Sequence, residues 1–240
     1  NIFIAALTRI TGSFERAFEE SCRVLSTRGR VFPLTRKNVR LGAVLSDGSR
    51  ILGEALISKS SLPIRKIFID PPDFDVTPEV VSAIVDAELI VIGPGSLYTS
   101  ILPNLLPEKC QSALLRTKAP VVYICNVMTQ AGETVGFSAA DHVRTIYDHR
   151  RPGMRGFIDW IVLNTQSPPA DYIEKYRQER ATPVKADIDA LRQMGLRVMA
   201  GDFLKGDVVV ETAEGQKHVL RHDAEKLVRK ILPLRLEKQS

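Results

Sequence analysis

A glycine turn rich in hydroxyl groups follows a short apolar run in the 240-residue chain. Residues 89–92 are Leu-Ile-Val-Ile, which is typical of a strand covered on both faces, and the following Gly-Pro-Gly predicts a sharp turn. We call residues 93–100 the glycine loop, and its candidate ligand-binding residues are Gly93, Gly95, Ser96, Thr99 and Ser100. Hydroxyl and backbone N–H groups at the start of a helix favour phosphate binding. A plain turn with an ordinary helix cap is the alternative.

Polar side chains also follow the apolar run at residues 121–125. Asn126, Thr129 and Gln130 offer amide and hydroxyl groups at the end of an expected strand, and such groups orient a nucleotide or a sugar. We call residues 126–134 the amide loop. A loop that only leads into the next helix is the alternative, and Ser138 with Asp141 fits an N-cap and its partner three residues later. We favour ligand binding for the three amide-loop residues and a structural role for Ser138.

Signatures of catalysis and of metal binding are missing from the sequence. The chain has no Gly-x-Ser-x-Gly elbow, no Walker lysine and no dinucleotide fingerprint, so neither a nucleophile nor nicotinamide chemistry is indicated. Asp141 and His142 are neighbours on an expected helix and do not face each other, which argues against an acid–base dyad. The three cysteines have spacings that predict neither disulfides nor zinc. We expect no dedicated metal site; Mg²⁺ bridging ligand phosphates is the one cofactor left open, with Asp141 as its candidate ligand.

Several stretches resemble one protein family. Residues 93–106, Gly-Pro-Gly-Ser-Leu-Tyr-Thr-Ser-Ile-Leu-Pro-Asn-Leu-Leu, are similar nearly residue for residue to the signature of bacterial gluconeogenesis factors (YvcK-like), relatives of 2-phospho-L-lactate transferase (CofD-like). Residues 5–14 look like the family's early strand and loop, and residues 28–35 like the element after its first helix. Residues 123–134 and 140–143 resemble its second long motif, and residues 221–223 its C-terminal one. The resemblance adds Tyr98 to the candidate ligand-binding residues.

The resemblance implies that the ligand is a nucleotide-sugar of the UDP-N-acetylglucosamine type, bound with the help of Tyr176 and Arg221. From residue types alone, Tyr176 is a half-buried aromatic on an amphipathic helix and Arg221 a surface cation. The implied role is regulation of carbon metabolism, cell-wall synthesis and cell shape. The alternative is an enzyme that transfers a phospholactyl group from a dinucleotide donor to a deazaflavin. A scaffold with a vestigial pocket is a third interpretation. We favour binding without turnover, because no activated nucleophile is recognisable.

One departure from the family concerns the beginning of the chain. Members of the family open with a Gly-Gly-Thr-Gly turn after a first strand, whereas this sequence begins downstream of that turn, at Asn1. Either the turn precedes Asn1 in the complete protein or the protein lacks it. A protein without the turn would have an incomplete phosphate site, which would weaken the functional inference.

Strands alternate with helices along most of the chain. Apolar runs predict strands at residues 64–69, 89–92, 121–125, 160–163 and 197–200. Helical spacing predicts helices at residues 14–25, 78–86, 105–116, 138–148, 171–180, 187–194 and 223–232. Residues 38–45 and 50–57 flank Ser46-Asp47-Gly48-Ser49, which indicates a hairpin insert. We therefore predict one α/β domain over residues 1–240, a three-layer, doubly wound and mostly parallel sheet of the CofD-like, Rossmann type. The loops after residues 92, 125 and 163 would converge on one cleft.

Composition and charge exclude some classes of protein. The net charge of +5 comes from interspersed residues of both signs, and no reader motif is present, so we expect no nucleic-acid partner. We also expect no membrane partner, because no apolar stretch approaches the length of a bilayer span. The N-terminal residues lack the pattern of a secretion signal, which favours a cytoplasmic location. The expected partner is a nucleotide-sugar or another small phosphate-containing molecule, and a homo-oligomer is compatible with the sequence.

Overall fold

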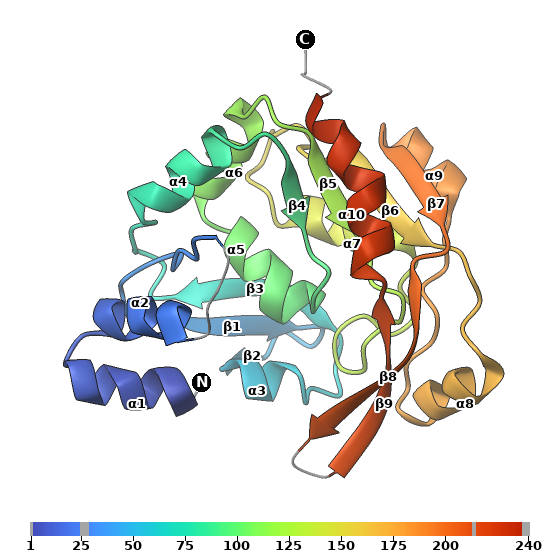
Figure 1. The fold of residues 1–240 in the computed structure, drawn as a ribbon, viewed down its shortest axis with the longest axis horizontal. Coiled ribbons are helices and arrows are strands. Elements are labelled where there is room, and N and C mark those ends of the chain that lie inside the picture. Colours follow the sequence, from blue (N-terminus) through green and yellow to red (C-terminus); the bar gives the residue numbers. More distant parts are fainter. Residues whose placement is uncertain (1, 25–28, 213–214, 237–240) are drawn as a thin grey trace.

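The computed structural model describes residues 2–24, 29–212 and 215–236. A four-stranded parallel sheet forms its centre, in the order β4-β5-β6-β7 (Figure 1). Its strands are β4 (Ile90–Ile92), β5 (Val121–Ile124), β6 (Trp160–Asn164) and β7 (Arg197–Gly201). Each strand agrees to within one residue at either end with an apolar run of the sequence. The predicted parallel sheet of an α/β fold is therefore confirmed.

Helices cover both faces of this sheet. Val122 and Ile124 of β5 pack on one face against Leu227 and Ile231 of α10 (Ala224–Ile231), which Figure 1 shows crossing the sheet. On the other face, the core formed by the alternate β5 residues includes side chains of α6 (Glu108–Arg116), α7 (Ala139–Asp148) and α9 (Ile188–Gln193). A strand that is buried on both faces needs apolar residues at every position, as β5 has.

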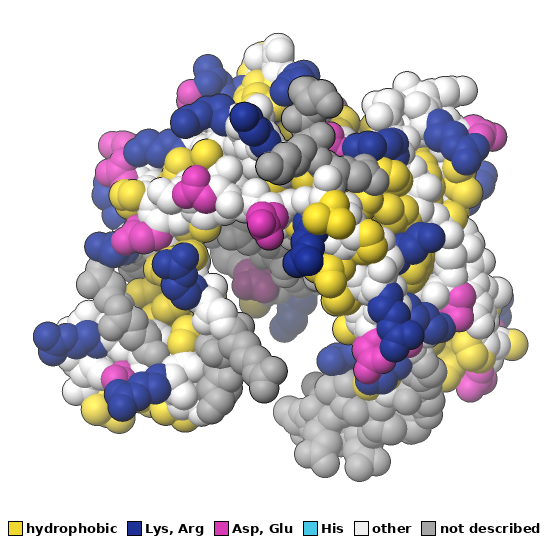
Figure 2. All heavy atoms as spheres, turned by 45° about the horizontal axis from the view of Figure 1, so that its top comes forward, with side chains coloured by type: hydrophobic (Ala, Val, Ile, Leu, Met, Phe, Trp, Pro, Cys, Tyr) yellow, Lys and Arg dark blue, Asp and Glu magenta, His cyan; other side chains and the backbone are white. Residues whose placement is uncertain are grey.

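The predicted helices are present, with ends that shift by at most three residues. The remaining ones are α2 (Phe14–Val24), α4 (Pro78–Val85) and α8 (Ala170–Gln178), and a short helix, α5 (Leu102–Leu105), precedes α6. In the described part of the chain, no helix has the length and apolar character that crossing a bilayer requires. Figure 2 shows basic and acidic side chains interspersed on the face in view.

The hairpin insert forms part of a second, antiparallel sheet in the order β2-β1-β3. Its strands are β1 (Arg40–Leu45), β2 (Arg50–Leu52) and β3 (Ile64–Asp70), and the chain leaves β2 through the one-turn helix α3 (Glu54–Ile57). We expected residues 64–69 to belong to the parallel series, but β3 pairs antiparallel with β1. Exposed Arg65 and Lys66 give the physical reason, because a strand with a solvated stretch does not suit the doubly covered parallel sheet.

A histidine joins the antiparallel sheet to α7. The backbone N–H of Ile67 in β3 donates to Nε2 of His149, the residue that ends α7, at 3.1 Å. The Nδ1 of the same ring lies 2.8 Å from the carbonyl oxygen of Thr145. Burial lowers the pKa of His149, although the Thr145 carbonyl opposes this change. A neutral imidazole that donates from Nδ1 and accepts at Nε2 satisfies both contacts.

The start of the chain differs from the prediction. Residues 5–14 were expected to form a strand and loop, but the structure has a helix there, α1 (Ile2–Thr11), which packs on α2. The hydroxyls of Thr8 and Thr11 donate to the carbonyl oxygens four residues earlier, which removes their usual competition with the helical backbone. Gly12, with a φ of 69°, ends the helix.

A third sheet is a two-stranded ribbon near the C-terminus. It consists of β8 (Leu204–Thr212) and β9 (Gly215–His222), paired antiparallel, and we call it the C-terminal ribbon. Figure 1 shows it extending away from the parallel sheet. The chain then enters α10 and a 3-10 helix, η2 (Leu232–Leu236). The ribbon was not predicted from the sequence, and it carries the candidate residue Arg221.

Candidate functional site

The glycine loop leaves the carboxyl end of β4 through a backbone conformation that favours glycine. Gly93 has a φ of 80°, and a Cβ at this position would lie 3.1 Å from the carbonyl oxygen of Ile124 in the neighbouring strand β5. The Gly93–Pro94 peptide bond is cis. Gly95 differs, because a Cβ there would lie 3.4 Å from the Cβ of Ser100, an ordinary contact. A side chain at residue 93 would strain the turn after β4, whereas at residue 95 the space beside the backbone is open enough for a Cβ.

The amide loop binds the backbone of the glycine loop directly. The N–H of Gly95 donates to Oδ1 of Asn126 at 3.2 Å, and Nδ2 of Asn126 donates to the carbonyl oxygen of Gly95 at 2.8 Å. Ser96 donates its hydroxyl to Oε1 of Gln130 at 2.8 Å. The structure therefore brings together the two loops that the sequence assigned to one site.

A buried carboxylate that was not among the predicted residues completes this contact. The Oε2 of Glu133 accepts from the backbone N–H of Tyr98 at 3.0 Å, and its Oε1 accepts from the Thr99 hydroxyl at 2.9 Å. These residues begin η1 (Leu97–Ile101), a π-helical turn that continues into α5. Ser96, at the N-cap, makes no side-chain capping bond. Glu133 therefore caps the start of this helix, although it lies 35 residues after Tyr98 and 34 residues after Thr99 in the sequence.

Two hydrogen bonds stabilise the negative charge of the Glu133 carboxylate. Its side chain is buried, and no ion pair joins it to Lys or Arg among the described residues. Burial raises the pKa of Glu133, while the bonds from Tyr98 and Thr99 oppose this rise. A carboxylate at a helix N-terminus also interacts favourably with the helix dipole.

Three predicted residues have side chains with different environments. The ring of Tyr98 is buried, and its hydroxyl lies 3.4 Å from the carbonyl oxygen of Ile64. The Thr129 hydroxyl is also buried and accepts from the backbone N–H of Thr182 at 2.9 Å, so it positions the segment at residue 182. Ser100 is exposed and its side chain is open to solvent. Of these three, Ser100 has the hydroxyl best placed to meet a ligand.

A glycine of the amide loop fixes the distance to the antiparallel sheet. Gly132 has a φ of 79°, and a Cβ at this position would lie 2.6 Å from the carbonyl oxygen of Ser58, just after α3. Any side chain here would force the two backbones apart. Gly132 was not singled out from the sequence, because the residues beside it, Ala131 and Glu133, do not indicate the close approach of the Ser58 backbone.

The C-terminal ribbon meets the carboxyl end of β5. The Nε2 of His222 lies 3.2 Å from the carbonyl oxygen of Cys125, the residue before the amide loop. Burial lowers the pKa of His222, and the Cys125 carbonyl opposes this change. Arg221 precedes His222 in β9, is exposed, and extends from the opposite face of the ribbon because successive strand residues alternate. This contact brings the Arg221 segment next to the amide loop.

Tyr176 has a positioning role in the same region. It lies on α8 and its hydroxyl accepts from the backbone N–H of Leu220 in β9 at 3.1 Å. The hydroxyl that could contact a ligand therefore already holds the strand that carries Arg221. Tyr176 therefore contacts the residue that precedes Arg221 in β9.

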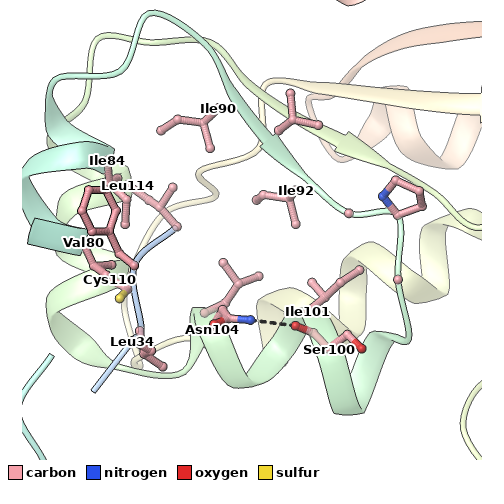
Figure 3. A pocket seen from close by; sticks show the side chains of 16 residues that line it. Leu34, Val80, Ile84, Ile90, Ile92, Ser100, Ile101, Asn104, Cys110 and Leu114 are labelled. Carbon is pink, nitrogen blue, oxygen red and sulfur yellow. Dashed lines mark hydrogen bonds between the residues drawn. The ribbon is translucent and has the colours of Figure 1, made fainter. Parts of the chain in front are cut away.

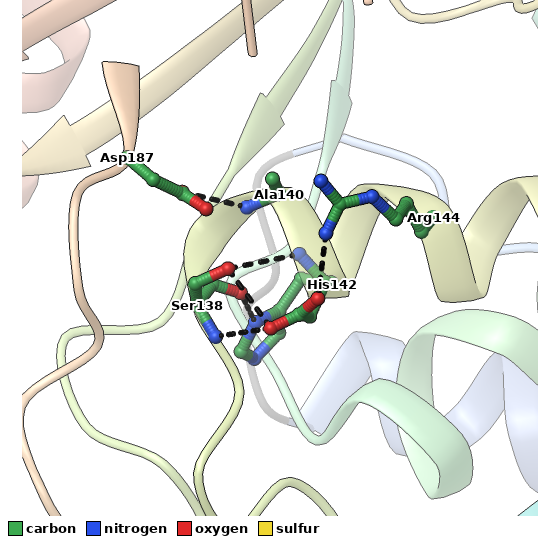
Figure 4. A network of polar contacts seen from close by, with 6 residues as sticks. Ser138, Ala140, His142, Arg144 and Asp187 are labelled. Atoms are coloured by element: carbon green, nitrogen blue, oxygen red, sulfur yellow. Dashed lines mark hydrogen bonds and ion pairs between the residues drawn. The ribbon is translucent and has the colours of Figure 1, made fainter. Parts of the chain in front are cut away.

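Asp141, the candidate Mg²⁺ ligand, belongs to a helix cap. Figure 4 shows the network around Ser138: the N–H and hydroxyl of Ser138 both donate to Oδ2 of Asp141 at 2.9 Å, and Arg144 donates to Oδ1 at 2.7 Å. Burial acts to raise the pKa of Asp141, but these donors together lower it. The predicted capping role of Ser138 is confirmed.

The oxygens of Asp141 are already engaged by neighbouring donors. The described residues contain no group of three or more His, Cys, Asp or Glu side chains arranged to hold an ion. His142 is fully buried, with Nδ1 2.8 Å from the Ser138 carbonyl oxygen, so it does not face Asp141 as a dyad. Asp141 is therefore not available as a ligand for Mg²⁺ in this arrangement.

A mostly apolar cavity of about 420 Å³ adjoins the glycine loop. Figure 3 shows Ile90 and Ile92 of β4 on one side and Ser100 and Asn104 on the other. Asn104 donates to the carbonyl oxygen of Ser100 at 2.8 Å. Polar groups occur only at the end of the cavity beside residues 93–100, so that end is the part of the cavity that suits a charged ligand.

The remaining donors define the chemistry of the site. Gly95, Tyr98 and Thr99 already direct polar groups to the amide loop, and the N–H groups of Ser100 and Ile101 bond to the Ser96 carbonyl oxygen. Among the described residues, the backbone N–H of half-buried Ser96 and the exposed Ser100 hydroxyl have no protein partner and are available to a ligand, whereas Leu97 is fully buried. Such a set can bind an anion and has no paired acid and base.

Comparison with known proteins gives consistent matches over most of the chain. The model of the family described as 2-phospho-L-lactate transferase CofD matches residues 1–204. The gluconeogenesis factor of Bacillus subtilis (strain 168) is 41% identical over 236 residues, which cover 98% of this chain and 70% of that protein. The gluconeogenesis factor of Halalkalibacterium halodurans is 40% identical over 233 residues, covering 97% and 68%.

A solved structure shares the fold. The crystal structure of a member of the UPF0052 family from Bacillus halodurans superposes with a TM-score of 0.84 at 39% sequence identity. The match covers 97% of this chain and 71% of that one. In the gluconeogenesis factor of Bacillus subtilis and the putative gluconeogenesis factors of Nostoc and Thermoanaerobacterium thermosulfurigenes, the matched region covers between 49% and 70% of the relative. The similarity therefore extends across nearly all of this chain.

Proposed function

The chain belongs to the CofD family, among the gluconeogenesis factors, and on this premise we propose that it is a regulatory protein that binds a nucleotide-sugar of the UDP-N-acetylglucosamine type. The diphosphate binds at the glycine loop, and the sugar and base extend over the amide loop and the C-terminal ribbon. The bound state signals the supply of precursors, which connects carbon metabolism with cell-wall synthesis and cell shape.

The single observation that carries this proposal is the contact between the glycine and amide loops. Asn126, Gln130 and Glu133 together hold the segment from Gly95 to Thr99 at the carboxyl end of the parallel strands, where ligands of doubly wound sheets bind. The backbone N–H of half-buried Ser96 has no protein partner among the described residues. A segment that is already ordered binds a ligand without the entropic cost of ordering it.

Arg221 supplies the positive charge in this proposal. Its segment is held next to the amide loop by the His222 contact with Cys125, and the guanidinium group is exposed. Arg binds phosphate oxygens with two parallel N–H bonds and stays charged at all physiological pH values. The base or sugar then lies near Tyr176, which fixes β9 from the side of α8.

A thermal-shift and calorimetry experiment tests the proposal. The chain is titrated with UDP-N-acetylglucosamine, UDP-glucose and N-acetylglucosamine, and we expect the two nucleotide-sugars to raise the melting temperature because they bind only the folded state. The free sugar lacks the diphosphate and is the matched control. Equal shifts with all three compounds, or no shift with either nucleotide-sugar, would contradict the proposal.

A transferase is the second candidate, because the matching family model carries the description of 2-phospho-L-lactate transferase. The same protein is incubated with a deazaflavin acceptor, the phospholactyl dinucleotide donor and Mg²⁺, and the product is followed by chromatography. We expect no multiple-turnover product, since the site has no paired general acid and base. Repeated turnover would replace the regulator proposal with the enzyme.

A further inference from the structure

The backbone of β3 depends on His149 for one of its hydrogen bonds. β3 lies at the edge of its sheet, so the N–H groups on its outer side have no neighbouring strand to bond. The N–H of Ile67 donates instead to Nε2 of His149 at 3.1 Å. Both residues are buried, and a buried N–H that loses its acceptor costs free energy. The junction between β3 and α7 is therefore sensitive to the state of this imidazole.

Only the neutral imidazole can accept this hydrogen bond. Nδ1 of His149 lies 2.8 Å from the carbonyl oxygen of Thr145, which can only accept, so the single proton of the ring is on Nδ1 and Nε2 carries a lone pair. A second proton would enter on Nε2, where it would face the N–H of Ile67. Two donors would then oppose each other in a buried place, and the bond between β3 and α7 would be lost.

The groups around the ring come from four elements. Lys66 of β3 disfavours the protonated ring, and Asp148 of α7 favours it. Gln111 of α6, which donates to the His149 carbonyl oxygen at 3.3 Å, and Tyr98 of η1 are both uncharged at neutral pH. Burial is the largest influence, and it lowers the pKa of His149. An opened junction therefore accepts the proton more readily than the closed one.

Tyr98 connects this junction to the glycine loop. Its ring meets the His149 ring edge-on, with the centroids 6.1 Å apart, and its hydroxyl lies 3.4 Å from the carbonyl oxygen of Ile64 at the start of β3. The backbone N–H of Tyr98 is bonded to Glu133 of the amide loop. Displacement of β3 and of the imidazole therefore removes two contacts of the Tyr98 side chain, at the start of η1.

We propose that His149 is a pH-sensitive switch: protonation of its ring detaches β3 from α7 and loosens the start of η1 through Tyr98. The switch operates in the chain without ligand and does not depend on the proposed function. The closed form holds His149 neutral, whereas the opened or unfolded chain takes up a proton below about pH 6.5. This contribution to stability is therefore complete above that pH and is lost as the pH falls below it.

Two variants separate the acceptor from the rest of the ring. In His149→Gln the amide oxygen takes the place of Nε2 and accepts from Ile67, but it gains no proton at pH 5.5. In His149→Asn the amide NH₂ group takes the place of Nδ1 beside Thr145, and the acceptor for Ile67 is absent. The glutamine variant keeps the junction closed, and the asparagine variant leaves it open.

Amide hydrogen exchange at pH 7.5 and 5.5, corrected for the intrinsic exchange rates, tests the proposal. In the wild-type chain we expect the protection of the Ile67 N–H to fall by about tenfold at pH 5.5, one pH unit below the ordinary pKa of histidine, and that of the Tyr98 N–H to fall with it. His149→Gln keeps Ile67 protected at both pH values, and His149→Asn exposes it at both. A fall at Tyr98 that persists in His149→Gln belongs to protonation of Glu133.

His222→Gln is the matched control. His222 is also partly buried, but its Nε2 donates to the Cys125 carbonyl oxygen, so protonation leaves that bond in place. We expect this variant to keep the wild-type pH response of Ile67.

Equal falls of Ile67 protection in the wild-type and His149→Gln chains, or no fall in the wild-type chain, overturn the switch. Equal falls at Tyr98 in these two chains overturn its transmission to η1. ¹⁵N NMR of the wild-type imidazole gives a test that needs no variant. A ring that takes up a proton on Nε2 between pH 7.5 and 5.5 while Ile67 stays protected overturns the proposal, whereas loss of Ile67 protection together with that protonation supports it.

Discussion

The glycine loop and the C-terminal ribbon belong to the same proposed site but are held in different ways. Three side chains of the amide loop bond to consecutive parts of the glycine loop, and most of these groups are buried or half-buried. The ribbon is a local antiparallel pair that contacts the rest of the protein through Tyr176 on Leu220 and through His222 on Cys125. The comparison suggests that the loop is shaped before a ligand arrives, and that the ribbon brings charge to it.

The largest expected effect is on the glycine loop. Asn126→Ala removes both bonds to Gly95 and leaves a half-buried N–H and carbonyl without their partner, so we expect the free energy of unfolding to fall by about 3 kcal/mol. Urea unfolding monitored by circular dichroism measures this change. The affinity for UDP-N-acetylglucosamine should fall as well, because the loop loses its shape.

Asn126→Asp is a second variant of nearly the same shape. It keeps the acceptor for the Gly95 N–H but places a carboxylate oxygen against the Gly95 carbonyl oxygen, where two acceptors repel, so it should also destabilise the protein. A loss below about 1 kcal/mol in Asn126→Ala would show that the loop is not held by these bonds, and the contrast with the ribbon would disappear.

An intermediate effect is expected for Arg221, and it concerns binding alone. Arg221→Ala should weaken nucleotide-sugar binding by about 2 kcal/mol, the size of a charge-assisted hydrogen bond, with little change in stability because the side chain is exposed. Calorimetry measures the affinity. Lys205→Ala, the exposed cation that pairs with Arg221 across the ribbon, is the control for loss of positive charge. Equal losses of affinity in both variants would show that Arg221 contributes only general electrostatic attraction and makes no specific contact with the phosphate.

The smallest effect is expected at the attachment of the ribbon. Tyr176→Phe removes the hydroxyl that accepts from Leu220, and we expect a loss of about 1 kcal/mol in the free energy of unfolding. The ring remains in place on α8, so packing is retained. Nucleotide-sugar affinity should change less than in Arg221→Ala. A loss of affinity larger than that would indicate that the hydroxyl contacts the ligand, and Tyr176 would then count as a binding residue.

The sequence was sufficient to predict the strands that carry the loops. Uninterrupted apolar runs such as residues 121–124 leave no alternative to a doubly covered strand, and polar residues at their ends mark the loops. The same reasoning assigned residues 64–69 to the wrong sheet, because pairing partners are set by tertiary contacts that a strand's own pattern does not contain. The helical start of the chain was missed because the strand and loop expected at residues 5–14 came from the family resemblance, whereas the structure has the helix α1 there, packed on α2.

The role of Glu133 was beyond sequence reasoning for a related reason. Its partners Tyr98 and Thr99 are 35 and 34 residues away, and no local capping pattern points to them. The polar residues of both loops were predicted as groups that meet a ligand. Their side chains instead bond across the loops: Asn126 to Gly95, Gln130 to Ser96 and Thr99 to Glu133. The sequence shows which residues are polar, but only the folded structure shows which of them already have hydrogen-bond partners within the protein.

The space around two glycines sets how this protein can diverge during evolution. A methyl group at residue 95 meets an ordinary contact at 3.4 Å, so a lineage can exchange Gly95 and alter what approaches the loop while the fold persists. At residue 132 the same methyl group would lie 2.6 Å from the Ser58 backbone, in a conformation that only glycine adopts readily. A new side chain is therefore tolerated more easily at residue 95, beside the cavity, than at residue 132, where it would separate the amide loop from the backbone after α3.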